Sequence, residues 1–121
     1  MKPSNKKERW LAVGEALPEV PAVDVPDQVW LLDVREDDEW AAGHAPGARH
    51  IPLGQLGART AEIPQDAPIY VICRSGVRSA RVTQALNGAG WQAVNVAGGM
   101  QDWAAARRPM ITDSGAEPFV A

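Results

Sequence analysis

The chain has 121 residues, of which 45% are hydrophobic and 22% charged, and this composition suits one folded domain built around one core. Its formal net charge of −3 gives no general attraction for nucleic acid or an anionic membrane, and the basic residues near its start form only a short cluster. No apolar stretch approaches the roughly 18 residues that span a bilayer, no export signal is evident, and a single cysteine forms no internal disulfide, so we expect a cytoplasmic protein.

Residues 1–28 are expected to form an extended lead-in that is partly packed on the domain. They are polar at first and then spaced by Pro18, Pro21 and Pro26, which argues against a long helix. A short strand is expected near residues 20–25. Trp10 lies in the polar part and is expected either to cap the domain or to stay exposed.

The remaining elements follow from the spacing of apolar residues. Short runs rich in β-branched and aromatic residues predict strands at 29–34, 49–51, 69–72 and 93–96. Helical spacing and helix-start signals predict helices near 37–42, 53–59, 79–89 and 100–106. Because the strands are almost continuously apolar, we expect an α/β fold in which a small parallel β-sheet is covered by helices on both faces. In such a sheet the functional site lies at the carboxyl end of a strand.

Several other features are interpreted as structural. The acidic run from Glu36 to Glu39 is expected to form a solvated first helical turn, where carboxylates complement the helix dipole. Four tryptophans are expected in the core or at its edge, namely Trp30, Trp40, Trp91 and Trp103. The C-terminal tail, residues 110–121, is expected to lie loosely on the surface, although Phe119 and Val120 are apolar enough to dock on the domain.

The stretch from Cys73 to Ser79 carries the chemistry that the sequence predicts. It places the only cysteine between an apolar strand and a helix start, where unpaired backbone N–H groups and the helix dipole favour an anion. Arg74 and Arg78 add two positive charges, and Gly76 allows a backbone conformation in which successive N–H groups converge. Such surroundings lower the pKa of a thiol, so we interpret Cys73 as a reactive thiolate rather than as the small buried hydrophobe that most lone cysteines are.

Four segments, in order along the chain, resemble the rhodanese (thiosulfate sulfurtransferase) family. The run Cys73-Arg74-Ser75-Gly76-Val77-Arg78 is similar to that family's active-site loop. The other three matches are Asp33-Val34-Arg35 to its early Asp-Val-Arg segment, Gly43-His44-Ala45-Pro46-Gly47-Ala48 to its Gly-His-x-Pro-Gly-Ala turn, and residues 98–103 to its late Gly-Gly-x-x-x-Trp segment. The resemblance covers residues 29–109 and implies one rhodanese-like domain there, with no internal repeat.

The resemblance implies a sulfurtransferase. Cys73 would take the outer sulfur from thiosulfate or another persulfide donor, hold it as a persulfide, and pass it to a thiol, to cyanide or to a sulfur-relay protein. The donor and the transferred sulfur would be bound by Arg74, Ser75, Gly76, Val77 and Arg78. Of the two arginines Arg78 is the stronger candidate, because its charge adds to the helix dipole. Such covalent chemistry needs neither a metal nor an organic cofactor.

Other functions remain open beside this one. Cysteine phosphatases place an arginine six positions after the cysteine, whereas Arg78 stands five positions after Cys73, so phosphate-ester or arsenate chemistry is the weaker alternative. The same fold could serve as a non-catalytic binding or regulatory module, although such a module has no need for an intact cysteine with two arginines. A redox sensor at Cys73 would need an external thiol, because the chain holds no second cysteine.

The remaining polar candidates are interpreted as supporting residues. His44 and His50 are far from Cys73 in sequence, and His44 is expected to tie down its own turn. Two histidines and one cysteine at this spacing do not make a zinc site. Asp33 and Arg35 are expected to form an ion pair that braces the neighbouring loop, and Ser79 to support the cysteine loop from the helix.

Overall fold

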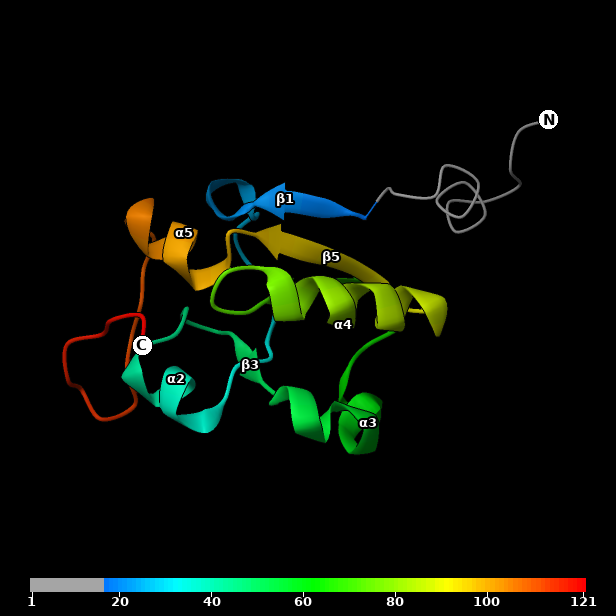
Figure 1. Cartoon of the computed structure of the whole chain (residues 1–121), viewed down its shortest axis with the longest axis horizontal. Coiled ribbons are helices and arrows are strands. Elements are labelled where there is room, and N and C mark those ends of the chain that lie inside the picture. The colour runs from blue at the N-terminus through cyan, green and yellow to red at the C-terminus, as the bar shows by residue number, and fades with distance from the viewer. Residues whose placement is uncertain (1–16) are drawn as a thin grey trace.

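Five parallel strands form the sheet of the protein, which is described by a computed structural model over residues 17–121 (Figure 1). Trp10 and most of the predicted lead-in therefore lie outside the described residues. The strand order is β1-β5-β4-β2-β3, so the two edges are formed by β1 and β3. The strands are β1 (Glu19–Pro21), β2 (Trp30–Asp33), β3 (Arg49–His50), β4 (Pro68–Ile72) and β5 (Gln92–Ala97).

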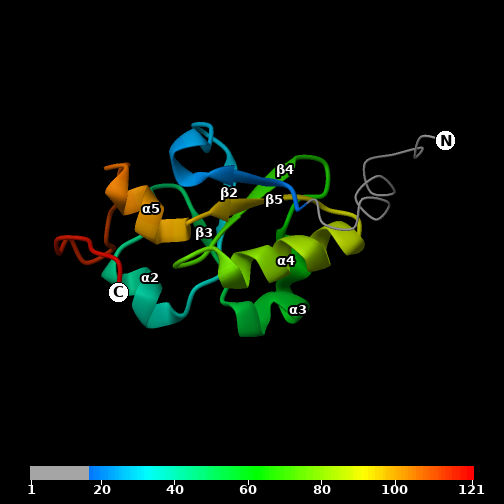
Figure 2. The ribbon, with the colours of Figure 1, turned by 45° about the horizontal axis from the view of Figure 1, so that its top comes forward.

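Helices pack against both faces of this sheet, as Figure 2 shows. The α-helices are α2 (Asp37–Ala42), α3 (Leu56–Arg59), α4 (Val77–Gly88) and α5 (Gly99–Ala105). The described residues also include three short 3₁₀ helices, namely η1 (Ala22–Asp24), η2 (Leu53–Gln55) and η3 (Thr60–Glu62). Helices α3 and α4 lie on one side of the sheet, and α5 and η1 on the other. Within the described residues, no helix is long and apolar enough to cross a membrane.

The alternation of side chains along each strand builds a separate apolar cluster on each face. Leu32 of β2 and Val71 of β4 point to the side of α4, where they join Val82 and Leu86. Neighbouring residues on the same strands point the opposite way and join the cluster around Met100 and Trp103 of α5. Since successive side chains of a strand lie on opposite faces, a strand covered on both faces is apolar at most of its positions. This explains the continuous apolar runs in the sequence.

The predicted α/β fold, with a parallel sheet covered on both faces, is confirmed. The predicted strands and helices agree with the observed ones to within one or two residues at each end, except that the predicted strand near 20–25 is shorter and gives way to η1. Because all five strands are parallel, their carboxyl ends lie along the same end of the sheet. Asp33, Cys73 and Gly98 each stand at or just after such an end.

The C-terminal tail is held against the domain rather than loose, and of the two apolar residues expected to allow docking, Val120 packs on the core while Phe119 stays exposed. The backbone of Ile111 exchanges hydrogen bonds with that of His44, and the N–H of Phe119 donates to the carbonyl of Ala42. Gly43 permits this contact, because a Cβ there would lie 2.8 Å from the Phe119 carbonyl oxygen. The tail is therefore ordered by backbone pairing with the turn after α2, a partner that its own sequence does not indicate.

Candidate active site

Cys73 lies directly after β4, with its side chain buried against the first turn of α4. The backbone N–H of Gly76 donates to its sulfur at 3.1 Å, and the N–H of Ser79 donates at 3.4 Å. The Ser79 hydroxyl oxygen lies 3.2 Å from the sulfur and is the donor when the sulfur is a thiolate. Three donors from one turn of chain thus converge on one sulfur atom.

These contacts decide the protonation state of the thiol. Burial alone raises the pKa of Cys73, but the hydrogen bonds from the Ser79 hydroxyl and from the N–H groups of Ser79, Gly76 and Ser75 outweigh it, so the pKa of the thiol lies below its ordinary value. The sequence predicts this lowering from the N–H groups and dipole of the helix start together with the charges of Arg74 and Arg78. In the structure it comes mainly from neutral donors within the loop, because the arginine side chains are directed elsewhere.

The loop keeps its shape through two left-handed glycine positions. Gly76 has φ of 103°, which turns its N–H toward the sulfur as α4 begins. Gly99, with φ of 55°, lies so close to the loop that a Cβ would stand 2.7 Å from the carbonyl oxygen of Arg74. The start of α5 also donates to the loop, from Met100 N–H to the Cys73 carbonyl at 2.8 Å and from Gln101 N–H to the Arg74 carbonyl at 3.0 Å. The glycine pair at 98 and 99 therefore lets α5 support the back of the cysteine loop.

Asp33 and Arg35 form a fully buried ion pair behind the site. The Arg35 guanidinium contacts Asp33 through Nη2 to Oδ2 at 2.7 Å and through Nε to Oδ1 at 2.9 Å. Its remaining N–H groups donate to the carbonyls of Glu39 at 3.1 Å and Gly43 at 2.9 Å. Every charge and polar atom of this pair thus has a partner, and together they fix α2 and the following turn to the end of β2.

The two loop arginines are placed differently. Arg78 forms a bidentate ion pair with Glu39, with N–O distances of 2.7 and 2.8 Å. Glu39 lies in the first turn of α2, as the acidic run predicts, but it is not solvated, because its carboxylate pairs with Arg78 at the start of α4. Arg74 is exposed, and its Nε donates to the carbonyl of Ala121 in the C-terminal tail at 2.9 Å. The sequence did not predict the pairing of Glu39 with Arg78, because no local pattern connects residues 39 positions apart.

The two other predicted loop residues face solvent. Ser75 is exposed, and the Val77 side chain at the start of α4 is 63% exposed. The exposed valine therefore presents an apolar side chain on the loop beside the exposed Arg74. Whether Ser75 and Val77 contact a donor stays a prediction.

The histidines hold structural positions. The His44 ring donates from Nδ1 to the Trp40 carbonyl at 2.9 Å, and the His50 ring donates from Nε2 to the Arg35 carbonyl at 2.7 Å. Both rings also stack on the Trp40 indole. His44 thus ties the turn to α2. In the part of the chain that the structure describes, no group of three or more His, Cys, Asp or Glu side chains could hold a metal ion.

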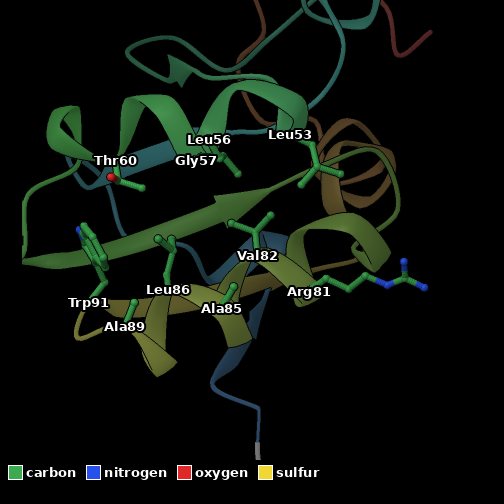
Figure 3. A pocket seen from close by; sticks show the side chains of 10 residues that line it. All are labelled: Leu53, Leu56, Gly57, Thr60, Arg81, Val82, Ala85, Leu86, Ala89 and Trp91. Atoms are coloured by element: carbon green, nitrogen blue, oxygen red, sulfur yellow. The ribbon is translucent and has the colours of Figure 1, made fainter.

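A separate apolar cavity of about 310 Å³ lies between α3 and α4 (Figure 3). Leu56 from α3 and Val82 and Leu86 from α4 face it, and Trp91 closes one end. None of the residues from Cys73 to Ser79 lines it. The Cys73 sulfur is thus not part of this cavity, and the candidate site is the cysteine loop itself.

Comparisons with known proteins agree on one family. The family model described as a rhodanese-like domain matches residues 20–106. "Putative sulfurtransferase YtwF" of Bacillus subtilis is 38% identical over 87 residues, covering 72% of this chain and 84% of that protein. A protein named "Sulfurtransferase" from Allochromatium vinosum is 33% identical over 90 residues, covering 74% and 84%. The crystal structure of a rhodanese-related protein from Thermoplasma volcanium aligns with a TM-score of 0.75 and 29% identity, over 79% of this chain and 99% of that one.

Proposed function

This chain belongs to the rhodanese-like domain family, and on that basis we propose that it is a sulfurtransferase whose Cys73 carries sulfane sulfur as a persulfide. The observation that carries the proposal is the convergence of the Gly76 N–H, the Ser79 N–H and the Ser79 hydroxyl on one buried sulfur. These donors stabilise a thiolate, which is the form of cysteine that attacks sulfur.

In the first half-reaction, the Cys73 thiolate attacks the outer sulfur of the donor. A new S–S bond forms at Sγ while the donor's own bond to that sulfur breaks, and the electron pair leaves with the rest of the donor. With thiosulfate as donor, the thiolate and the dianion give the Cys73 persulfide anion and the sulfite dianion, so charge and atoms balance. The backbone N–H groups of the loop are fixed before the reaction and can stabilise the negative sulfur without reorganising.

In the second half-reaction, a thiophilic acceptor takes the terminal sulfur and returns Cys73 to the thiolate. A small thiol, cyanide or the cysteine of a sulfur-relay protein would each serve as acceptor, and would approach past the exposed loop residues Arg74 and Val77, because Cys73 itself is buried. Thiosulfate and these acceptors are part of the proposal. No step requires a metal or an organic cofactor.

The competing proposal is a non-catalytic module of the same fold that binds or regulates a partner. It leaves the donors around Cys73 without a purpose, since a buried cysteine that only packs does not need a lowered pKa. The two proposals differ in whether sulfur is ever bound to Cys73.

The deciding experiment is the mass of the intact protein after incubation with thiosulfate and removal of the excess. We expect the wild type to gain the mass of one sulfur atom and to lose it on treatment with cyanide or a thiol. Cys73→Ser, which keeps the size of the residue and removes the nucleophile, should gain nothing. If the wild type takes up no sulfur from thiosulfate, from polysulfide or from a thiosulfonate, the sulfurtransferase proposal is wrong and the binding module is favoured.

A further inference from the structure

Arg78, one of the two cations of the cysteine loop, is already neutralised within the protein. Both of its Nη atoms are used by the two carboxylate oxygens of Glu39, at 2.7 and 2.8 Å. This bidentate geometry is the strongest arrangement available to an arginine and a carboxylate. The Glu39 side chain is only 15% exposed, which limits screening of the pair by solvent. An incoming anion therefore meets a paired arginine.

Glu39 is held in this position by its own backbone and by its neighbours. Its Oε1 accepts the N–H of Glu36 at 2.9 Å in the capping box that begins α2. Its carbonyl accepts from the buried Arg35 guanidinium, which is itself fixed by Asp33. The hydrogen bond from Arg78 lowers the pKa of Glu39 to about 2, against the opposing effect of burial, so this carboxylate stays charged at any working pH.

The surroundings of Cys73 consequently offer an incoming anion little positive charge that is not already paired. Arg74 is exposed and has one N–H donating to Ala121, which leaves its two Nη groups for a ligand. The carboxylate of Glu36 acts on Arg78 through space, as does the Cys73 sulfur. Together with the thiolate, the carboxylates of Glu36 and Glu39 outnumber the two guanidinium groups around the loop.

We propose that Glu39 is a specificity-determining residue that makes the Cys73 site favour singly charged sulfane donors, such as an organic persulfide or thiosulfonate, over the thiosulfate dianion. The inference rests on the proposed sulfur transfer at Cys73 and names its donor class. When the thiolate attacks thiosulfate, the reacting groups carry three negative charges in total. When it attacks a thiosulfonate, they carry two. The nearby Glu39 charge therefore penalises the dianion more.

The test compares two donors that present the same outer sulfur with different charge, thiosulfate and the methanethiosulfonate anion. Methanethiosulfonate gives the same persulfide and releases methanesulfinate, so both reactions are followed by the rate of mass gain at Cys73. Glu39→Gln keeps the size of the side chain and an oxygen for the Glu36 N–H. We expect the ratio of rate constants, thiosulfate over methanethiosulfonate, to rise roughly three- to tenfold in Glu39→Gln, because one negative charge near the sulfur is removed.

Glu62→Gln is the matched control. Glu62 forms the same kind of bidentate pair, with Arg59 at 2.8 and 3.0 Å, and its removal changes the net charge by the same amount at another place. The donor ratio should stay unchanged in this variant. An unchanged ratio in Glu39→Gln, or an equal rise in both variants, overturns the proposal. An equal fall in both rates in Glu39→Gln would assign Glu39 a structural role only and overturns it too.

The wild type supplies an independent measurement. Salt screens the repulsion of the dianion more than that of the monoanion, so raising the ionic strength should increase the thiosulfate rate relative to the methanethiosulfonate rate. A relative decrease would show a net cationic entrance and contradict the proposal. If the wild type gains sulfur from neither donor, the proposed sulfur transfer itself fails, a result that is distinct from an unaltered donor ratio.

Discussion

At the scale of single residues, the geometry gives Ser79 a more direct position than the supporting one that its sequence indicates. Its hydroxyl and its N–H both reach the Cys73 sulfur, and the residue is fully buried. Arg74 and Arg78, the residues that draw attention in the sequence, contact Ala121 and Glu39 instead. The thiolate therefore depends first on neutral hydrogen-bond donors and only second on full charges.

This arrangement predicts that Ser79→Ala raises the pKa of Cys73. The lost hydroxyl is the strongest of the contacts that lower this pKa, while burial, which raises it, remains. The rate of alkylation by iodoacetamide, measured against pH, should show its midpoint moved to higher pH. Ser79→Thr, which retains a hydroxyl, should restore much of the wild-type profile. An alanine variant with the wild-type midpoint would show that the backbone N–H groups suffice.

At the scale of elements, the cysteine loop is supported by helix α5, which follows it in the chain after α4 and β5. The N-terminal N–H groups of α5 donate to the carbonyls of Cys73 and Arg74, and Gly99 makes this approach possible. The late glycine pair thus acts on the site without contacting the sulfur.

We expect Gly99→Ala to slow formation of the Cys73 persulfide by about tenfold or more, because a Cβ at this left-handed position would push against the loop carbonyls and misplace the attacking sulfur. Gly57→Ala is the control, since a Cβ at Gly57 in α3 meets nothing within 4 Å. Rates are followed by intact mass and folding by circular dichroism. A folded Gly99→Ala protein with the wild-type rate would contradict this role for α5.

At the scale of the whole molecule, the buried Asp33–Arg35 pair joins β2, α2 and the turn at Gly43 at the carboxyl edge of the sheet. The polar atoms of both side chains already have hydrogen-bond partners, so the pair holds these elements in place and takes no part in the reaction. Breaking such a pair is costly because it leaves a buried charge without a partner.

Arg35→Ala is therefore expected to lower the free energy of unfolding by about 3–5 kcal/mol, as urea denaturation would measure. Arg59→Ala, which breaks the exposed pair with Glu62, should lower the free energy of unfolding far less, because solvent screens that pair. Equal losses in the two variants would show that burial of the Asp33–Arg35 pair makes no difference to its contribution.

The sequence by itself determined the elements, the parallel sheet and the position of the cysteine loop. Apolar patterning is a local signal, and a strand covered on both faces is apolar at most positions, so β2, β4 and β5 could be predicted without knowledge of the strands they pair with. The motifs from Asp33 to Trp103 likewise carried the resemblance to a family that the comparisons then confirmed.

Only the tertiary structure decided which charges meet at the site. The pairing of Glu39 with Arg78, the contact of Arg74 with Ala121 and the packing of α5 behind the loop join residues distant in the chain. An ion pair depends on the distance and direction between two side chains, and the sequence states neither until the sheet and its helices have been assembled.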